Sequence, residues 1–316
     1  MLAAPNFVRA QVGGLPGPTP PPPQLKDQTH GGIRVSTDLV LLHVTVMDEH
    51  GQFVPGLKQN NFRVYEDKVE QKISAFLGED VPVTMGLVVD NSGSMREKRA
   101  QVNAAALTFI KTSNPQDEVF VVNFNDEYYL DLDKDFTNDQ RELNEALSRI
   151  DARGSTALFD AVIGSLDHLR KGHKDKKVLL VITDGDDDAS RKKLADVVAV
   201  AQKSDAQIYA IGVFSDEDRK SAKKMIRNSK KELTEMTSVS GGAAYFPETL
   251  EQVQSICAQV AHDIRNQYTL GYYPSNLAMD GSFRAVQVQL IQPKDRGKMT
   301  ARTRAGYYSQ KTSHGD

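Results

Sequence analysis

The stretch VTMGLVVDNSGSM, residues 83–95, decides the fold of this protein. It begins as an almost unbroken apolar run, which is the pattern of a strand buried on both faces in a parallel sheet. The run ends in Asp90, Ser92 and Ser94, which occupy every second position. Ligands of open parallel sheets bind beyond the carboxyl ends of the strands. We therefore expect a polar site directly after this strand.

Apolar runs alternate with helical patterns over residues 81–266. The expected strands are 83–90, 118–124, 177–185, 207–214 and 243–246. The expected helices lie near 95–112, 138–150, 156–171, 190–204, 229–240 and 249–266. Alternation of this kind predicts an α/β fold, in which a doubly wound, mainly parallel sheet carries helices on both faces.

The segments on either side have a different character. Residues 34–80 and 267–310 each hold about three short runs with the period-two alternation of half-buried strands. Since two or three strands alone are marginal in water, we expect both segments to form one discontinuous β-sandwich of six to seven strands, into which the α/β domain is inserted. Residues 1–33 carry seven of the 13 prolines, including the run PTPPPP, and predict a disordered linker. Residues 311–316 are expected to be a disordered tail.

The composition limits the classes of protein to consider. The 316 residues carry a net charge of −3, which gives no support for nucleic-acid binding, and no apolar run reaches the ~18 residues of a transmembrane helix. Cys257 is the single cysteine, so no disulfide forms within the chain, and its place on the apolar stripe of 249–266 indicates a core residue. The N-terminal MLAAPNFVRAQVGG is too short and interrupted for a complete signal peptide, although it also fits the end of a trimmed one.

Two further polar clusters follow the expected strands or open the expected helices. Thr156 lies in the glycine-containing turn of ARGSTALFDA, and Asp184 follows the apolar run of LLVITDGDDD. Folding is expected to bring five residues to one rim: Asp90, Ser92, Ser94, Thr156 and Asp184. All five are oxygen donors, which suit Mg²⁺, Mn²⁺ or Ca²⁺ and disfavour zinc. Only two of them are carboxylates. If one of these two binds a divalent ion through a water, the ion stays electron-poor, and a carboxylate of a partner is its natural further ligand.

The motifs D-x-S-x-S at 90–94, G-S-T at 154–156 and T-D-G at 183–185 resemble the metal-ion-dependent adhesion site (MIDAS) of von Willebrand factor type A (VWA) domains. The resemblance covers roughly residues 80–266. The flanking segments resemble those of a bacterial, acidobacterial-type group of VWFA-related proteins, which are mostly uncharacterised and usually exported. A periplasmic, secreted or cell-surface location is therefore expected, with a cytoplasmic one left open.

The resemblance also implies a site and a function. The hydroxyls of Ser92, Ser94 and Thr156 would coordinate Mg²⁺, or Mn²⁺ or Ca²⁺ in its place. Asp90 and Asp184 would bind the ion directly or through water. The domain would then capture an Asp or Glu side chain of a partner protein through the ion, as in cell adhesion.

The same residues also fit plainer structural roles. With Glu97 three residues on, Ser94 fits a capping box that starts a helix. Thr156 fits a helix N-cap, and Asp184 fits a solvated turn residue. We expect the remaining acidic residues of this turn to be solvated charges rather than ligands; these are Asp186, Asp187 and Asp188.

Three classes of function compete on this evidence. The leading hypothesis is a metal-dependent protein-binding module that is not an enzyme. A metal-dependent hydrolase is the alternative, and it needs a base beside the ion to activate water, which the sequence does not identify. The third is a structural or assembly subunit in which the metal site is unused. The oligomeric state does not follow from the sequence.

Overall fold

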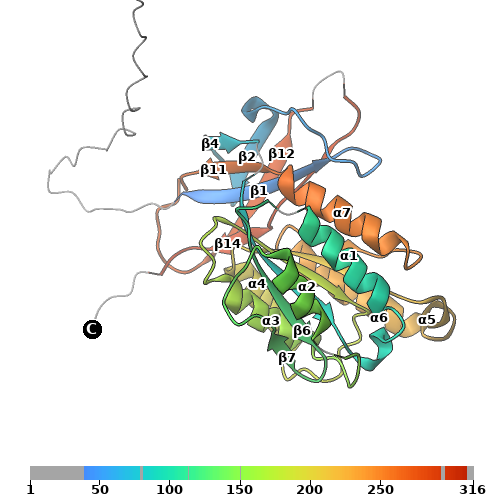
Figure 1. Ribbon diagram of the computed structural model, residues 1–316. Coiled ribbons are helices and arrows are strands. Elements are labelled where there is room, and N and C mark those ends of the chain that lie inside the picture. The colour runs from blue at the N-terminus through green and yellow to red at the C-terminus, as the bar shows by residue number, and fades with distance from the viewer. Residues whose placement is uncertain (1–38, 79–80, 113, 150, 293–295, 312–316) are drawn as a thin grey trace, which may run out of the picture. The chain divides into compact units, whose positions relative to one another are not determined.

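The computed structural model describes residues 39–78, 81–112, 114–149, 151–292 and 296–311. The expected proline-rich linker, 1–33, lies outside the described residues, and so does all of the expected tail except Lys311. In the described part, strands alternate with helices between β5 and α7, and short strands dominate before and after this region (Figure 1). The domain boundaries given above remain predictions.

Six strands form one mainly parallel sheet in the order β10-β9-β8-β5-β6-β7. Its strands are β5 (Val83–Asp90), β6 (Glu118–Phe124), β7 (Tyr128–Leu130), β8 (Lys176–Thr183), β9 (Gln207–Gly212) and β10 (Ala244–Tyr245). Of these six, β7 alone runs antiparallel to its neighbour. All eight residues of β5 are buried, as its apolar run predicts. Because β6 and β8 flank β5 on opposite sides, the strand order reverses there, and the carboxyl end of β5 is a place where a ligand site is expected.

Helices cover both faces of this sheet, which confirms the predicted fold class. One core contains residues of α1 (Arg99–Lys111), α2 (Gln140–Ser148) and α7 (Gln252–Arg265). The core on the other face contains residues of α3 (Leu158–Leu169), α4 (Leu194–Lys203) and α6 (Lys223–Ser238). Figure 1 shows α1 and α7 side by side, and their apolar stripes, Cys257 included, share the first core. A short 3-10 turn, η2 (Gly93–Met95), precedes α1.

Two features of the helical region differ from the sequence prediction. A short helix after β9, α5 (Asp216–Ser221), was not expected, because DEDRKS has no apolar periodicity. It is started by a capping box between Ser215 and Asp218 instead. In addition, α6 begins at Lys223 and not near 229, because the apolar face of its start is thin, with only Met225 and Ile226.

The two ends of the chain together build two four-stranded sheets, ordered β13-β1-β11-β4 and β14-β12-β2-β3. Their strands are β1 (Val40–Met47), β2 (Phe62–Glu66), β3 (Val69–Gln71), β4 (Ile73–Leu77), β11 (Tyr268–Tyr272), β12 (Phe283–Leu290), β13 (Thr300–Arg302) and β14 (Gly306–Tyr308). A 3-10 turn, η1 (Gln59–Asn61), precedes β2. Side chains from both sheets, such as Leu42, Phe62 and Leu270, share one core, as expected for a sandwich. The expected six to seven strands become eight, because the run MTARTRAGYY is divided between the two sheets as β13 and β14 and because the short strand β3 was not expected.

A polar cluster is buried inside this sandwich. The carboxylate of Glu66 accepts hydrogen bonds from the hydroxyls of Tyr272 and Tyr307, at 2.8 and 2.7 Å. Nη1 of Arg284 lies 3.6 Å from the same carboxylate, and both charged side chains are only 2% exposed. A buried carboxylate is tolerated when it is paired and hydrogen-bonded in this way. Burial raises the pKa of Tyr272, so its hydroxyl stays a donor to Glu66.

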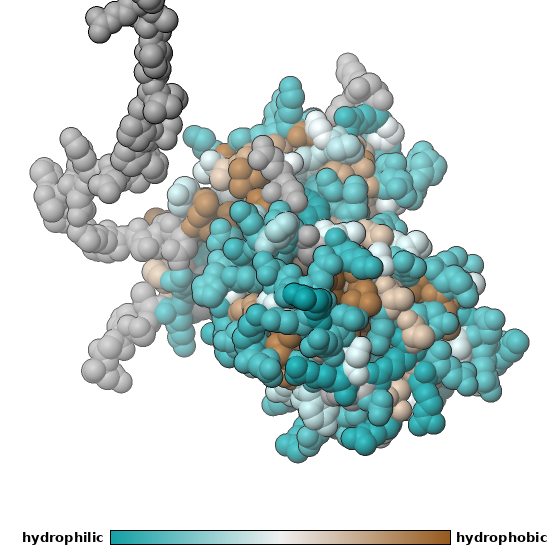
Figure 2. Space-filling model, in the orientation of Figure 1, coloured by the Kyte–Doolittle hydropathy of each residue, from teal (hydrophilic) through white to brown (hydrophobic). Residues whose placement is uncertain are grey.

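The face of the molecule seen in Figure 2 is predominantly hydrophilic, with hydrophobic residues gathered in small areas. In the part of the chain that the structure describes, no helix has both the length and the apolar character needed to cross a bilayer.

Candidate functional site

The five predicted site residues lie on three loops at one edge of the parallel sheet. Asp90 is the last residue of β5, and Ser92 and Ser94 follow it in the turn that contains η2. Asp184 comes directly after β8, and Thr156 precedes α3. Since β5 and β8 are parallel neighbours, their carboxyl ends meet at the same edge. The hydroxyl of Thr183 donates to Oδ2 of Asp90 at 2.6 Å, which joins the two strand ends directly.

The loop before α3 is held against the loop after β5 by backbone hydrogen bonds. The N–H of Gly93 donates to the carbonyl of Gly154 at 3.0 Å, and the N–H of Arg153 donates to the carbonyl of Asn91 at 2.9 Å. Gly154 has φ = +77°, and a Cβ there would lie 2.1 Å from a carboxylate oxygen of Asp126. The backbone conformation and the nearby carboxylate both favour glycine here, which explains the glycine of the G-S-T motif.

The loop after β8 closes onto Thr156. The N–H of Thr156 donates to Oδ1 of Asp188 at 2.7 Å, and the N–H of Asp188 donates to the carbonyl of Thr156 at 3.1 Å. Asp187 accepts from the N–H of Phe159 in the first turn of α3, at 2.9 Å. Asp187 and Asp188 thus have a structural role besides their charge, although Asp188 is exposed to solvent, as expected. They fasten the third loop to the second, while Asp186 is exposed as expected.

The buried carboxylate of Asp90 is fixed by neutral donors. Its Oδ1 accepts from the N–H of Ser92 at 2.8 Å, and its Oδ2 accepts from Thr183 as described. Burial, and next the negative charge of Asp184, raise the pKa of Asp90 to about 7, although the hydrogen bonds from Ser92 and Thr183 oppose the rise. The raised pKa shows that the ionised form is destabilised here, and a cation at this edge would relieve that cost.

The hydroxyl side of the site reaches the solvent. Oγ of Ser92 and Oγ of Ser94 lie 3.0 Å apart, within hydrogen-bond distance. Ser92 is buried, whereas Ser94 is exposed. Thr156 and Asp184 are buried. The five oxygen donors therefore run from a buried end at the two carboxylates to an open end at Ser94.

Neither Ser94 nor Thr156 caps a helix. Helix α1 begins at Arg99 with Lys98 at its N-cap, so Ser94 does not cap it. Helix α3 has Ala157 at its N-cap, with no hydrogen bond from a side chain at that position. Asp184 is likewise no solvated turn residue, because it is 1% exposed.

Lys98 is a part of this site that the sequence prediction missed. Its ammonium is buried and lies 3.1 Å from Oδ2 of Asp184 and 2.8 Å from Oδ2 of Asp218. Oδ1 of Asp184 is also buried, and among the described residues it has no hydrogen-bond partner. A signal for Lys98 was present, because it shares a helical stripe with Val102 and Ala105, both core residues of α1.

The donor set matches a hard cation only if the hydroxyls take part. Among the described residues, no group of three or more His, Cys, Asp or Glu side chains is placed to hold a metal ion. The predicted site contains two carboxylates and three hydroxyls, a set that suits Mg²⁺ or Mn²⁺ better than zinc. The partnerless Oδ1 of Asp184 and the costly ionisation of Asp90 fit a cation at this edge, so the residues are compatible with the ion.

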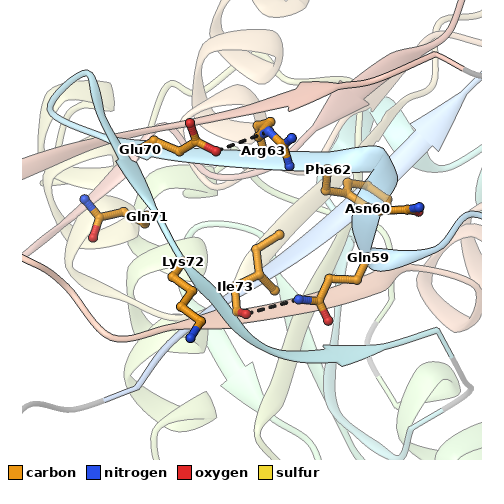
Figure 3. A pocket seen from close by; sticks show the side chains of 8 residues that line it. All are labelled: Gln59, Asn60, Phe62, Arg63, Glu70, Gln71, Lys72 and Ile73. Atoms are coloured by element: carbon orange, nitrogen blue, oxygen red, sulfur yellow. Dashed lines mark hydrogen bonds and ion pairs between the residues drawn. The ribbon is translucent and has the colours of Figure 1, made fainter.

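A surface pocket elsewhere offers no comparable set of groups. It is lined by residues of η1 and of the strands β2, β3 and β4, and by none of the five predicted residues (Figure 3). Arg63 and Glu70, on the neighbouring strands β2 and β3, pair at 3.2 Å, and the side chain of Gln59 donates to the carbonyl of Ile73 at 3.1 Å. Its polar groups are therefore partly engaged with one another.

Comparison with known proteins places the region that holds the site in a family. Residues 85–259, more than half of the chain, match the family described as von Willebrand factor type A domain. No curated protein gives a significant match. The fold resembles that of a von Willebrand factor type A protein from Catenulispora acidiphila, with a TM-score of 0.51 and 14% identity over 88% of this chain and 74% of that one.

Other solved structures are similar over a shorter part of the chain. The D319A mutant of the PilB minor pilin from Streptococcus sanguinis has a TM-score of 0.48 and 13% identity over 60% of this chain. The match covers 63% of the pilin, which is less than two thirds of its length. Proximal thread matrix protein 1 from the mussel byssus has a TM-score of 0.49 and 16% identity over 63% of this chain and 49% of that one. At such identities the likeness concerns the fold alone, whereas the family match rests on the sequence itself. The chain therefore belongs to the von Willebrand factor type A domain family.

Proposed function

We propose that this protein is a divalent-metal-dependent protein-binding module, which captures an acidic side chain of a partner protein through an ion held by Asp90, Ser92, Ser94, Thr156 and Asp184. Domains of this family often mediate protein interaction, which supports a binding role and not an enzymatic one. The observation that carries the metal proposal is the convergence of three loops around a buried pair of carboxylates.

The residues of the chain would divide the work of the site. Ser92, Ser94 and Thr156 would offer neutral hydroxyl oxygens, and Asp90 and Asp184 would offer the negative charge. Asp90 is already oriented by Ser92 and Thr183, so little side-chain entropy is lost on binding. The bound ion would supply a positive charge that accepts a carboxylate oxygen of the partner. Exposure of Ser94 supports approach of the partner from that side.

Metal binding is the first test of the proposal. Calorimetry with MnCl₂ is expected to give binding heat for the wild-type chain and none for Asp184→Asn. Asp186→Asn is the matched control, because it removes an exposed carboxylate from the same loop and leaves the five residues intact. An unchanged Mn²⁺ affinity in Asp184→Asn would contradict the assignment of the site.

Partner capture is the second test. Affinity capture from a native extract is expected to retain a protein in the presence of Mg²⁺ and to release it with EDTA. The Asp90→Ala variant is expected to capture none of it. If this variant captures the same partner as the wild-type chain, the protein is an assembly subunit whose metal site is unused. We also propose an exported location, on the strength of the resemblance of the flanking segments alone.

A further inference from the structure

Lys98 is a buried cation placed between the loop after β8 and the helix α5. Its side chain is 4% exposed, and its ammonium contacts one carboxylate oxygen of Asp184 and one of Asp218. Asp218 belongs to α5, on the loop after β9. A fourth loop is thereby linked to the three that hold the predicted ligands.

Asp218 is anchored independently of Lys98. Its Oδ2 accepts from the N–H of Ser215 at 2.8 Å, and its own N–H donates to the hydroxyl of Ser215 at 3.1 Å. This capping box holds the carboxylate at the start of α5. Lys98 is therefore supported on one side by a fixed acceptor while it contacts Asp184 on the other.

The contact leaves the two oxygens of Asp184 in different states. Oδ2 is taken by the ammonium of Lys98, at 3.1 Å, whereas Oδ1 is buried without a hydrogen-bond partner among the described residues. Lys98 thus cancels part of the negative charge of Asp184 and holds back one of its oxygens. Both effects weaken the hold of the site on a cation, and both leave more of the ion's charge for an anionic ligand.

We propose that Lys98 sets how this site divides its affinity between the divalent ion and the anionic group of the partner. Its ammonium lowers affinity for the ion and raises affinity of the loaded site for a carboxylate. Lys98 acts through Asp184 and is a positioning and specificity-determining residue, not an ion ligand. The inference rests on the proposed function, because it needs a metal ion at the five predicted residues.

The test uses the full chain and two probes. Mn²⁺ affinity is measured by calorimetry, and carboxylate affinity is measured by titrating acetate into the Mn²⁺-loaded protein while following water-proton relaxation, which falls as acetate displaces water from the ion. Lys98→Met is expected to bind Mn²⁺ at least about tenfold more tightly, since a positive charge close to the ion is removed. The same variant is expected to need a several-fold higher acetate concentration for half-displacement.

Two further variants keep the test decisive. Lys98→Arg retains the charge and is expected to stay close to the wild-type chain in both measurements. Lys98→Met combined with Asp218→Asn removes the carboxylate that the first substitution leaves without its partner, so it is measured if the single variant does not fold. In this double variant, Mn²⁺ is again expected to bind more tightly and acetate more weakly than in the wild-type chain. Both factors are expected to be smaller, because the loss of the Asp218 charge partly offsets the loss of the Lys98 charge. The offset is incomplete, since Asp218 is more exposed than Lys98.

The outcomes separate the two proposals. If Mn²⁺ and acetate both bind more weakly in the Lys98 variants, or Mn²⁺ affinity does not change, Lys98 only supports the fold and the inference is overturned while the proposed function stands. If the wild-type chain binds no Mn²⁺, the proposed function fails, and this inference fails with it.

Discussion

The carboxylate of Asp90 makes the metal-free protein less stable as the pH rises. The pKa of Asp90 is raised from its ordinary value of 3.8 to about 7, by burial and then by the charge of Asp184. In the unfolded chain the group loses its proton near pH 3.8, whereas in the folded chain it keeps the proton until about pH 7. The folded state therefore holds the extra proton between these values, and its stability falls across that window and levels off above it.

The size of this loss of stability follows from the difference between the two pKa values. At about 1.4 kcal/mol per pH unit, the loss amounts to about 4 kcal/mol by pH 7. Asp90→Asn keeps the shape of the side chain and removes the ionisation. The substitution weakens the hydrogen bond from Thr183, which costs about 1 kcal/mol at every pH. In EDTA, the variant is expected to be slightly less stable than the wild-type chain at low pH and about 3 kcal/mol more stable above pH 7.

Urea denaturation of both chains in EDTA, followed by far-UV circular dichroism from about pH 4 to about pH 8, measures this difference. Subtracting the unfolding free energy of one chain from that of the other removes the contribution of the titratable groups that both chains contain. Asp133→Asn serves as the control, because it removes a carboxylate whose side chain is 96% exposed. A stability difference between Asp90→Asn and the wild-type chain that does not change with pH would refute the reasoning. Saturating Mn²⁺ is expected to reverse the order and favour the wild-type chain, since the ion stabilises only the chain that binds it.

Three further predictions concern single positions. Gly154→Ala is expected to cost more than about 1 kcal/mol of unfolding free energy and to weaken Mn²⁺ binding, because a Cβ there collides with Asp126; in urea denaturation Gly51→Ala, also at positive φ but with open space around it, should cost less. Glu66→Ala is expected to lower the unfolding free energy by about 3–5 kcal/mol, since it removes the buried carboxylate that faces Arg284, and a similar loss in urea denaturation of Glu66→Gln would confirm the role of charge. Burial raises the pKa of Cys257 to about 12, so its thiol is expected to react with iodoacetamide only after unfolding, and labelling of the native chain would contradict this.

The α/β fold and the strand at its centre could be predicted from the sequence, because the signals are local. An almost unbroken apolar run such as that of β5 has few alternatives to a doubly covered strand, and the helices between such runs follow from their periodicity. The membership of Asp90 in a candidate site follows from its place at the end of that run. The ligand role of the five residues remains a prediction.

Where local signals were weak, the sequence prediction was incomplete. Helix α5 has no apolar stripe, and the division of MTARTRAGYY between two sheets leaves each of β13 and β14 with only three residues. Such short strands exist because of the neighbours that they pair with, so their own residues carry little information.

The sequence by itself determined which oxygen donors stand at the ends of which elements, because strand ends and turns follow from the order of apolar and polar residues. Only the tertiary structure decided how these donors are placed and charged. Contacts between loops far apart in the chain, such as Gly93 with Gly154 and Thr156 with Asp188, draw the site together. The ammonium of Lys98 reaches Asp184 across 86 positions of the sequence. Charge and burial depend on distance in space, and local sequence patterns do not record that distance.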